Sequence, residues 1–207
     1  MKKFLLSVAI TGLAFGVSAQ NIKLPAPQKT GGKPLMEVLN ERESNRAFAN
    51  KDLSNQTLSN LLWAAWGFNR ENKRTAPSSR DRQEIDVYVL LKKGTYIYDA
   101  KANTLIEVSK KDLRSFAGTQ EFVASAPVNL VYVCNKNKIS GKDDQALIEA
   151  TYANTGFIAQ NVYLFCASDG LSCVIRAMID KAELSTQLKL KKDQMITLSQ
   201  TVGYPAK

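Results

Sequence analysis

Histidine is absent from this sequence of 207 residues, and its absence removes several kinds of chemistry. Ser–His and Cys–His catalysis are excluded, because both need an imidazole as the general base. Histidine is also the commonest side chain that binds transition metals, so we expect no metal site. A catalytic scheme for this chain must therefore work without an imidazole.

Cysteine is scarce, with Cys134, Cys166 and Cys173 as the only three. Each lies in an apolar setting ("LVYVCN", "YLFCAS" and "LSCVI"), which favours buried free thiols. An odd number cannot pair completely, so one disulfide with one free thiol is the alternative. A disulfide requires two cysteines that are close in space, and the sequence does not choose a pair.

Long apolar runs are missing after the first twenty residues. At the start, Lys2 and Lys3 precede the apolar run "FLLSVAITGLAFGV", and "VSA" lies just before Gln20. This pattern is typical of a secretory signal peptide over residues 1–19. The run is too short to span a bilayer comfortably. We expect an exported protein, periplasmic or secreted, without stable membrane insertion after cleavage; an uncleaved N-terminal anchor is the alternative.

Acidic residues are fewer than basic ones, and the formal net charge is +9. Loss of Lys2 and Lys3 with the signal would leave +7, an excess that favours anionic partners. The lysines are scattered and lack the aromatic residues of RNA-binding motifs, so we expect no nucleic-acid partner. A basic protein that binds acidic polymers is a further alternative, and its affinity should fall steeply with salt.

The chain after the signal suits one domain, which we place at residues 34–207. Residues 20–33 are rich in proline, glycine and lysine and predict a flexible leader. No internal repeat or low-complexity block divides the rest.

Helical spacing appears in three places. A short helix is predicted from Pro34 to Asn40, with proline suited to its first turn. The segment "NQTLSNLLWAAW" predicts a second helix, which Ser54 can cap and Gly67 can end. The longest helical pattern runs over about 142–168 and closes at Gly170.

Other stretches have the period of strands. The run "DVYVLLKKGTYIYDA" (86–100) predicts two strands joined at a Lys-Lys-Gly turn. The near-continuous apolar run "PVNLVYVCN" (127–135) predicts a central strand. The remaining elements are a strand at 104–109, a short segment at 172–179, a helix near 181–190 and a last strand at 194–204. This order predicts an α+β fold, with one mixed or antiparallel sheet and helices packed on it.

The segment "ERESNRAF" is the first candidate site. Arg42, Ser44 and Arg46 alternate, so on an extended segment all three point the same way. Two guanidinium groups and a hydroxyl on one side would grip a phosphate through charge-assisted hydrogen bonds. The alternative is a solvated turn that pairs with Glu41 or Glu43.

Two further segments carry polar groups beside apolar strands. In "RTAPSSRDRQEIDVYV", a proline and two serines let the backbone come close to a ligand, although an ordinary helix-to-strand loop is the alternative. In "DGLSCVIRAMID", Arg176 lies within an apolar stretch. A buried unpaired charge is costly, so this arginine needs an anionic ligand or a partner such as Asp180.

Together these segments resemble the nitroreductase family of FMN-dependent oxidoreductases. The resemblance rests on "R-x-S-x-R-x-F", "P-S-S-x-x-x-Q" running into a strand, "QNVYLFCASDGL" on a long helix and "VGYP" near the end. The stretch "LLWAAWGFNR…RTAPS…QEIDVYV" is similar to the thiazoline-oxidase-like (dehydrogenase) branch. The resemblance covers residues 34–205. It implies the nitroreductase-like fold, bound FMN and a homodimer with the flavin site at its interface.

The resemblance also implies roles for particular residues. In the family, the early motif holds the FMN phosphate and ribityl chain, and the Pro-Ser-Ser loop lies against the isoalloxazine ring. Backbone N–H groups after the Gly-Leu turn face the flavin N5 edge, where many members have Glu-Gly. Many members have asparagine at the position of Asp81, whose carboxylate cannot donate to the ring carbonyl oxygens. The implied cofactor-binding residues are Arg42, Ser44, Arg46, Pro77, Ser78, Ser79, Asp81, Ala177 and Met178.

The implied function is that of an FMN-dependent oxidoreductase that passes electrons by a ping-pong mechanism to an unidentified small-molecule acceptor. The cofactor carries the electron chemistry, so neither a histidine nor a catalytic cysteine is needed. The alternative is a non-catalytic ligand-binding or interaction module on the same fold, with a degenerate flavin site.

Overall fold

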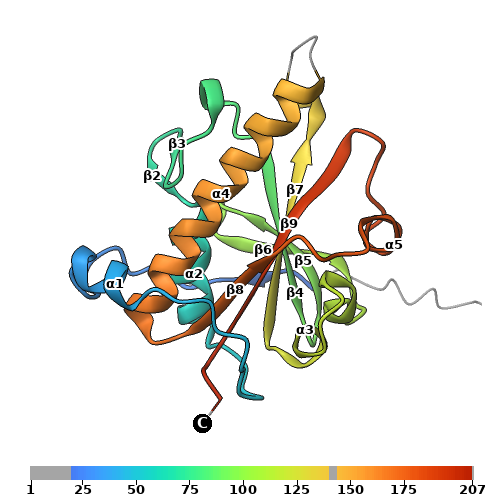
Figure 1. Cartoon of the computed structure of the whole chain (residues 1–207). Coiled ribbons are helices and arrows are strands. Elements are labelled where there is room, and N and C mark those ends of the chain that lie inside the picture. Colours follow the sequence, from blue (N-terminus) through green and yellow to red (C-terminus); the bar gives the residue numbers. More distant parts are fainter. Residues whose placement is uncertain (1–19, 140–143, 207) are drawn as a thin grey trace, which may run out of the picture.

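The strands predicted from the sequence lie side by side in one large sheet (Figure 1). The computed structural model describes residues 20–139 and 144–206; the expected signal peptide at 1–19 and the start of the predicted long helix lie outside the described residues. All strand pairings in this sheet are antiparallel. Of the two predicted sheet types, mixed and antiparallel, the structure therefore has the antiparallel one. In sheet order the strands are β1 (Ile22–Lys23), β6 (Thr104–Ser109), β5 (Gly94–Asp99), β4 (Ile85–Leu91), β7 (Val128–Asn135), β9 (Gln194–Gly203) and β8 (Ser172–Arg176).

Both faces of the sheet are buried, because successive side chains of a strand point to opposite faces. In β4, Val87 and Val89 belong to the apolar cluster on one face, whereas Tyr88 and Leu90 belong to the cluster on the other. The first cluster is completed by the helices α2 (Asn55–Trp66) and α4 (Asp144–Asp169), and α4 crosses this face diagonally in Figure 1. The second is completed from η2 (Arg114–Ala117), α3 (Phe122–Ser125) and α5 (Lys181–Gln187).

Local signals in the sequence set the ends of the helices. Ser54 Oγ accepts a hydrogen bond from the Thr57 N–H at the start of α2, and Gly67 follows its last residue. Gly170 follows α4 with a φ of +67°, a left-handed conformation that glycine adopts without steric cost. These caps confirm the predicted ends of α2 and the C-terminal end of α4. The short helix α1 (Leu35–Glu41) begins one residue later than predicted, with Pro34 as its cap.

Residues 20–33, which we expected to form a flexible leader, contact the rest of the fold. The strand β1 pairs with β6, and Leu24 is buried in the core. The Pro25 carbonyl accepts hydrogen bonds from Ser59 Oγ and Asn103 Nδ2. The prolines and glycines of this segment follow β1, so they do not interrupt it. Two residues are enough for β1 to pair with β6 at the edge of the sheet.

The remaining described elements lie between α2 and β4 and after β7. A small hairpin of β2 (Phe68–Arg70) and β3 (Lys73–Arg74) is followed by the single turn η1 (Ser79–Asp81). A second turn, η3 (Lys136–Lys138), follows β7. Among the described residues, no helix is long and apolar enough to cross a membrane.

All three cysteines are buried and unpaired, as the sequence predicted. Burial raises the pKa of the Cys166 thiol well above its ordinary value, and contact with Cys173 raises it further. Burial likewise raises the pKa of the Cys134 thiol. High pKa values and low exposure are typical of unreactive thiols.

The cap of α2 gives a direct test of this fold. Replacing Ser54→Ala removes the acceptor for the Thr57 N–H, and we expect the free energy of unfolding to fall by about 1 kcal/mol. Chemical denaturation of both proteins measures the difference. Ser125→Ala is the control, because that exposed hydroxyl caps no helix N-terminus, and its effect should stay within about 0.5 kcal/mol.

Candidate functional site

The segment that carries Arg42, Ser44 and Arg46 lies beside the edge strand β8. The Asn45 N–H donates to the Cys173 carbonyl of that strand, at 3.0 Å. Ser44 and Arg46 are exposed, and Arg42 is half-buried at the end of α1. The three predicted phosphate-binding residues therefore lie on one segment without helix or strand, next to β8.

A tyrosine of α4 anchors this segment. Tyr163 Oη lies 2.8 Å from Ser44 Oγ and accepts a hydrogen bond from the Ile175 N–H at 3.0 Å. The two hydroxyls share one hydrogen bond, in which either can be the donor. The Arg42 guanidinium lies 5.4 Å from the centre of the Tyr163 ring, within the range of a cation–π contact. The sequence motif "QNVYLFCASDGL" contains this tyrosine, but sequence reasoning gave it no role.

The solvated-turn alternative expected Arg42 or Arg46 to pair with neighbouring glutamates. In the structure Glu41 accepts from Lys33 Nζ at 2.6 Å instead. Glu43 accepts a long hydrogen bond from Asn45 Nδ2. Among the described residues, no carboxylate lies within ion-pair distance of either arginine. Exposed Arg46 and half-buried Arg42 therefore both keep a positive charge that no carboxylate of the described residues neutralises, which suits them to receive an anion.

The Pro-Ser-Ser loop lies between β3 and β4, against the N-terminal half of α4. The Ser79 N–H donates to Asn154 Oδ1 of α4 at 3.1 Å, and Ser78 Oγ accepts from the Gln83 N–H at 3.0 Å. Pro77 and Ser79 are exposed and Ser78 is half-buried. The backbone amide of Ser79 is thus held by a side chain, while the outer surface of the loop stays open.

Asp81 faces the small β2–β3 hairpin. Its carboxylate accepts from Lys73 Nζ at 2.5 Å and from Gln83 Nε2 at 3.1 Å. The hydrogen bond from Lys73, followed by that from Gln83, lowers the pKa of Asp81 below its ordinary value. At neutral pH this position is therefore an ionised acceptor whose oxygens are already engaged.

A buried carboxyl group beneath the loop was not found from the sequence. Glu84 is only 1% exposed, and its Oε1 accepts from Asn154 Nδ2 at 2.6 Å. Its Oε2 has no partner among the described residues. The signal available in the sequence was a glutamate directly before the apolar strand β4, which alone is compatible with an ordinary strand end.

The segment Ala177–Met178 follows β8 on the exposed side of the molecule. The Ala177 carbonyl accepts from the Ile179 N–H at 2.9 Å, and the Met178 carbonyl accepts from the Thr119 N–H at 3.2 Å. The Met178 side chain is 60% exposed. The backbone is held through its carbonyl groups, and the side chain stays in solvent.

Arg176 does not form the expected ion pair with Asp180. Its guanidinium is buried and donates to the Ala117 carbonyl, Thr201 Oγ1 and Asn129 Oδ1, all of them neutral acceptors. Asp180 instead caps α5 by accepting from the Glu183 N–H. Burial lowers the pKa of Arg176 to about 10. Three neutral acceptors make the burial of this charge possible without a carboxylate.

The structure brings two of the three predicted groups together. Phe48 stacks on Phe122 with ring centres 5.6 Å apart, and the Arg176 guanidinium lies 5.7 Å from the Phe122 ring, so the "ERESNRAF" segment and the end of β8 share one edge. The Pro-Ser-Ser loop contacts α4 at Asn154, nine residues before Tyr163, or about 13 Å along the helix axis. Among the described residues, no hydrogen bond joins this loop to either of the other groups.

No metal centre competes with this arrangement in the part of the chain that the structure describes. No group of three or more Cys, Asp or Glu side chains is placed to hold a metal ion there. The candidate site is therefore built from arginines, hydroxyls and backbone amides, which suit an anionic and polar organic ligand.

Comparison with known families gives a match over most of the chain. The model of the "Nitroreductase family" matches residues 39–204. A protein of Methanocaldococcus jannaschii assigned as a nitroreductase is 26% identical over 175 residues, which is 79% of this chain and 88% of that protein.

Solved structures agree with this match. A Ralstonia eutropha JMP134 protein assigned as a nitroreductase is 39% identical, with a TM-score of 0.86 over 100% of this chain and 97% of that one. The NADPH:FMN oxidoreductase of Vibrio harveyi, solved with NAD+, is 20% identical, with a TM-score of 0.64 over 84% of this chain and 69% of that one. The second likeness concerns the fold alone.

The contact between Lys73 and Asp81 predicts a measurable titration. Replacing Lys73→Met should raise the pKa of Asp81 back toward its ordinary value, because the largest stabiliser of the charged form is removed. A pH titration of the Asp81 carboxyl carbon by NMR measures this shift. Lys92→Met, on the distant β4–β5 turn, should leave it unchanged; an unchanged value in Lys73→Met would contradict the contact.

The sign of the effect on stability follows from the lowered pKa. A carboxyl group with a lower pKa in the folded chain stabilises the fold above its ordinary unfolded pKa. This stabilisation is lost as the pH falls through the folded pKa of Asp81. Because both side chains are largely exposed, the contribution to global stability should be small.

Proposed function

Because this chain belongs to the nitroreductase family, we propose that it is a flavin-dependent oxidoreductase that uses FMN. The observation that carries the proposal is the pair of arginines flanking Ser44, of which Arg46 is exposed and Arg42 half-buried; among the described residues, no carboxylate lies within ion-pair distance of either. Family membership supports the flavin, and the arginine pair supports a flavin that carries a phosphate.

The donor set fits the phosphate and ribityl chain of FMN. Arg42 and Arg46 would hold the phosphate through charge-assisted hydrogen bonds, which are about twice as strong as neutral ones. The Ser44 hydroxyl lies between them in the sequence and shares a hydrogen bond with Tyr163; when Tyr163 donates, the Ser44 proton is free to bond the ligand. Tyr163 would therefore orient Ser44 toward the cofactor.

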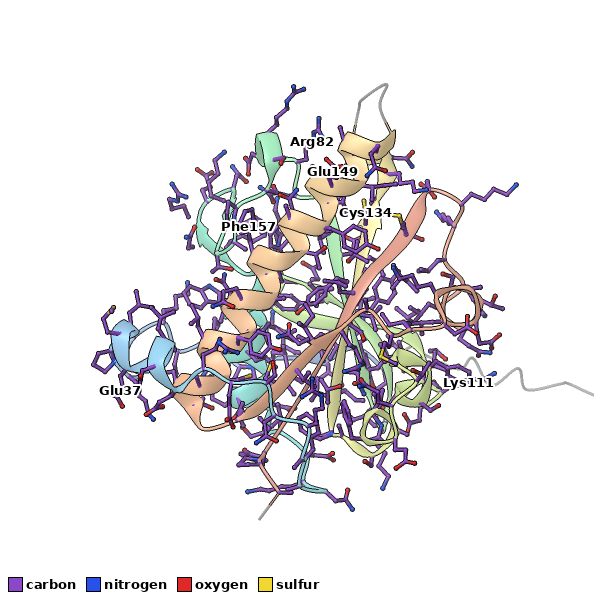
Figure 2. All side chains as sticks on the ribbon, in the orientation of Figure 1. Glu37, Arg82, Lys111, Cys134, Glu149 and Phe157 are labelled. Carbon is purple, nitrogen blue, oxygen red and sulfur yellow. The ribbon has the colours of Figure 1, made fainter. Side chains whose placement is uncertain are left out.

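We infer that a second copy of the chain completes the site. Within one chain the Pro-Ser-Ser loop lies apart from the other two groups, and the family resemblance implies a site at a dimer interface. The helix α1 exposes Leu35, Met36 and Leu39, and Met36 is 76% exposed. Phe157 is also exposed, on α4, which α1 contacts (Figure 2). These side chains would be buried if α1 and α4 faced a partner.

An open hollow of about 360 Å³ supports this choice of surface. It lies between α1, α2 and α4 and is lined largely by apolar groups. Its apolar members include Leu35, Val38, Trp63 and Phe165. Large contiguous apolar surface on a soluble protein is typical of an interaction site.

The chemistry would be divided between cofactor and protein. Bound FMN would supply hydride and electron transfer, first from a donor and then to an acceptor in the ping-pong order. The chain would bind the phosphate at Arg42 and Arg46, support the ring with Pro77, Ser78 and Ser79, and place the backbone of Ala177 and Met178 at its edge. The absence of histidine is compatible with this division.

We further propose that this protein works outside the cytoplasm on a small-molecule acceptor. The support is the sequence pattern of residues 1–19. Similarity of the sequence to the thiazoline-oxidase-like branch supports an acceptor of the size of a heterocyclic or quinone-like ring. The acceptor would reach the ring face left open by the loop.

The flavin proposal predicts a yellow protein. The purified protein should absorb in the flavin range and release FMN, identified by mass. The double variant Arg42→Ala/Arg46→Ala should weaken FMN binding at least a hundredfold, because each charge-assisted bond contributes about 1.5–3 kcal/mol. Fluorescence titration measures the dissociation constant.

A matched control separates local binding from net charge. Lys92→Ala/Lys93→Ala also removes two positive charges, at the β4–β5 turn, and should leave FMN affinity within about twofold. A colourless wild-type protein that ignores added FMN would contradict the proposal and favour the non-catalytic module on the same fold.

The dimer proposal predicts that α1 controls assembly. Replacing the exposed Leu39→Lys should convert a dimer into monomers, because a charge would be buried at the interface. Sedimentation velocity measures the mass, and FMN binding should fall in parallel. Lys110→Glu, an exposed charge change on another surface, should leave the mass unchanged. A wild-type protein that sediments as a monomer with bound FMN would refute the shared site.

A further inference from the structure

The loop that precedes β4 adopts an unusual backbone conformation. Arg80, Asp81 and Gln83 have φ values of +54°, +55° and +49°, in the left-handed region that non-glycine residues rarely adopt. A non-glycine residue in this region is strained, and the conformation persists only where surrounding contacts enforce it. Contacts on two sides of the loop, with the β2–β3 hairpin and with the core, enforce it here.

On the first side, the β2–β3 hairpin holds the side chain of Gln83. Its Oε1 accepts from Arg74 Nε at 2.9 Å, and its Nε2 donates to the Asn72 carbonyl at 2.8 Å and to Asp81 Oδ1 at 3.1 Å. Arg74 is itself fixed, because it donates to the Trp66 carbonyl at 2.8 Å and lies over the Phe68 ring. The amide of Gln83 therefore has a defined orientation, with oxygen toward Arg74 and nitrogen toward Asp81.

On the second side, the core holds the backbone of Ser79. Asn154 accepts from the Ser79 N–H with its oxygen and donates to Glu84 Oε1 with its nitrogen. The Ser79 N–H can only donate, so the Asn154 oxygen faces the loop and its nitrogen faces Glu84. The Glu84 backbone is paired in turn, since its carbonyl accepts from the Asn135 N–H of β7.

The supporting groups and the strained residues of this loop lie in different environments. The supporting groups Glu84 and Asn154 are buried, whereas the strained residues Arg80 and Asp81 are exposed. Strain in an exposed loop adds nothing to the packing of the core. A rigid and open loop surface, however, can receive a flat ligand without a further loss of conformational entropy.

We propose that Gln83 and Glu84 are positioning residues that hold Pro77–Asp81 in the conformation that receives the flavin ring. The inference rests on the proposed function. In this role Asp81 acts through Gln83 and Lys73 and holds the loop shape in place of a donor to the ring. Glu84 acts through Asn154 on the Ser79 amide.

Gln83→Glu is the sharpest test, because it keeps the size of the side chain and replaces only the donating NH2 group by an oxygen. The new oxygen would face the Asp81 carboxylate and the Asn72 carbonyl, and both contacts become repulsive. In flavin-free protein, trypsin should cut after Arg80 or Arg82 about tenfold faster, with fragments identified by mass. The dissociation constant for FMN should rise about tenfold, as expected if one strained residue is no longer held.

Two further variants keep the test specific. Gln187→Glu on α5 also turns an amide donor into an acceptor beside a carboxylate, that of Glu183, and should change neither readout. Asn154→Asp, which replaces the amide that donates to Glu84 Oε1 by a second carboxyl group, should repeat both effects of Gln83→Glu through the other support. Thermal unfolding of the flavin-free variants shows whether the fold itself is kept.

Rescue separates a positioning role from general damage. Adding Asp81→Asn to Gln83→Glu restores an amide donor facing a carboxylate, with the roles exchanged. The double variant should recover most of the resistance to trypsin in flavin-free protein, which is a coupling that independent lesions would not show.

The possible outcomes distinguish the two proposals. If the wild-type protein binds no FMN, the proposed function fails whatever trypsin shows. If it binds FMN and both Gln83→Glu and Asn154→Asp bind FMN equally well, only the positioning role is overturned. Faster cleavage with weaker FMN binding and an unchanged melting temperature supports the positioning role.

Discussion

The polar inner face of α4 is the constraint on which the candidate site depends. Thr155 Oγ1 lies 3.0 Å from Thr197 Oγ1 of β9, and Asn154 donates to the buried Glu84. A buried polar group that loses its partner costs about 1–3 kcal/mol. Sliding α4 by one turn would break both contacts, so its register against the sheet is fixed. That register places Asn154 under the Pro-Ser-Ser loop and Tyr163 under Ser44.

The edge strand β8 is the second fixed feature of the site. An exposed edge offers unpaired backbone groups to other chains, and proteins usually cover it. Here the segment with Arg42 and Arg46 runs beside β8, joined to it by the Asn45 N–H. The same contact therefore protects the edge and presents the two arginines. The buried Arg176 links this strand to its neighbours through neutral acceptors.

Rigid elements and exposed binding residues have separate tasks in this molecule. The sheet is buried on both faces, which accounts for the continuous apolar runs of β4 and β7. The residues that would touch a ligand lie in the connections between these elements, where most of them are exposed. Buried Asn154 and Tyr163 join the rigid elements to the binding residues: Asn154 bonds Glu84 on one side and the Ser79 N–H on the other, and Tyr163 bonds the Ile175 N–H of β8 and Ser44.

The sequence by itself determined the elements whose signals are local. Strand periodicity predicted the β4–β5 hairpin, a near-continuous apolar run predicted β7, and Ser54 and Gly67 predicted both ends of α2. The family motifs named the candidate binding residues. Only the tertiary structure decided which side chains support them: Glu84 with Asn154, Tyr163 with Ser44, and Arg176 with neutral acceptors. The partners in these contacts lie from 25 to 119 residues apart. Local periodicity carries no information about such pairs, because their distance is set by the register of α4 and of the sheet.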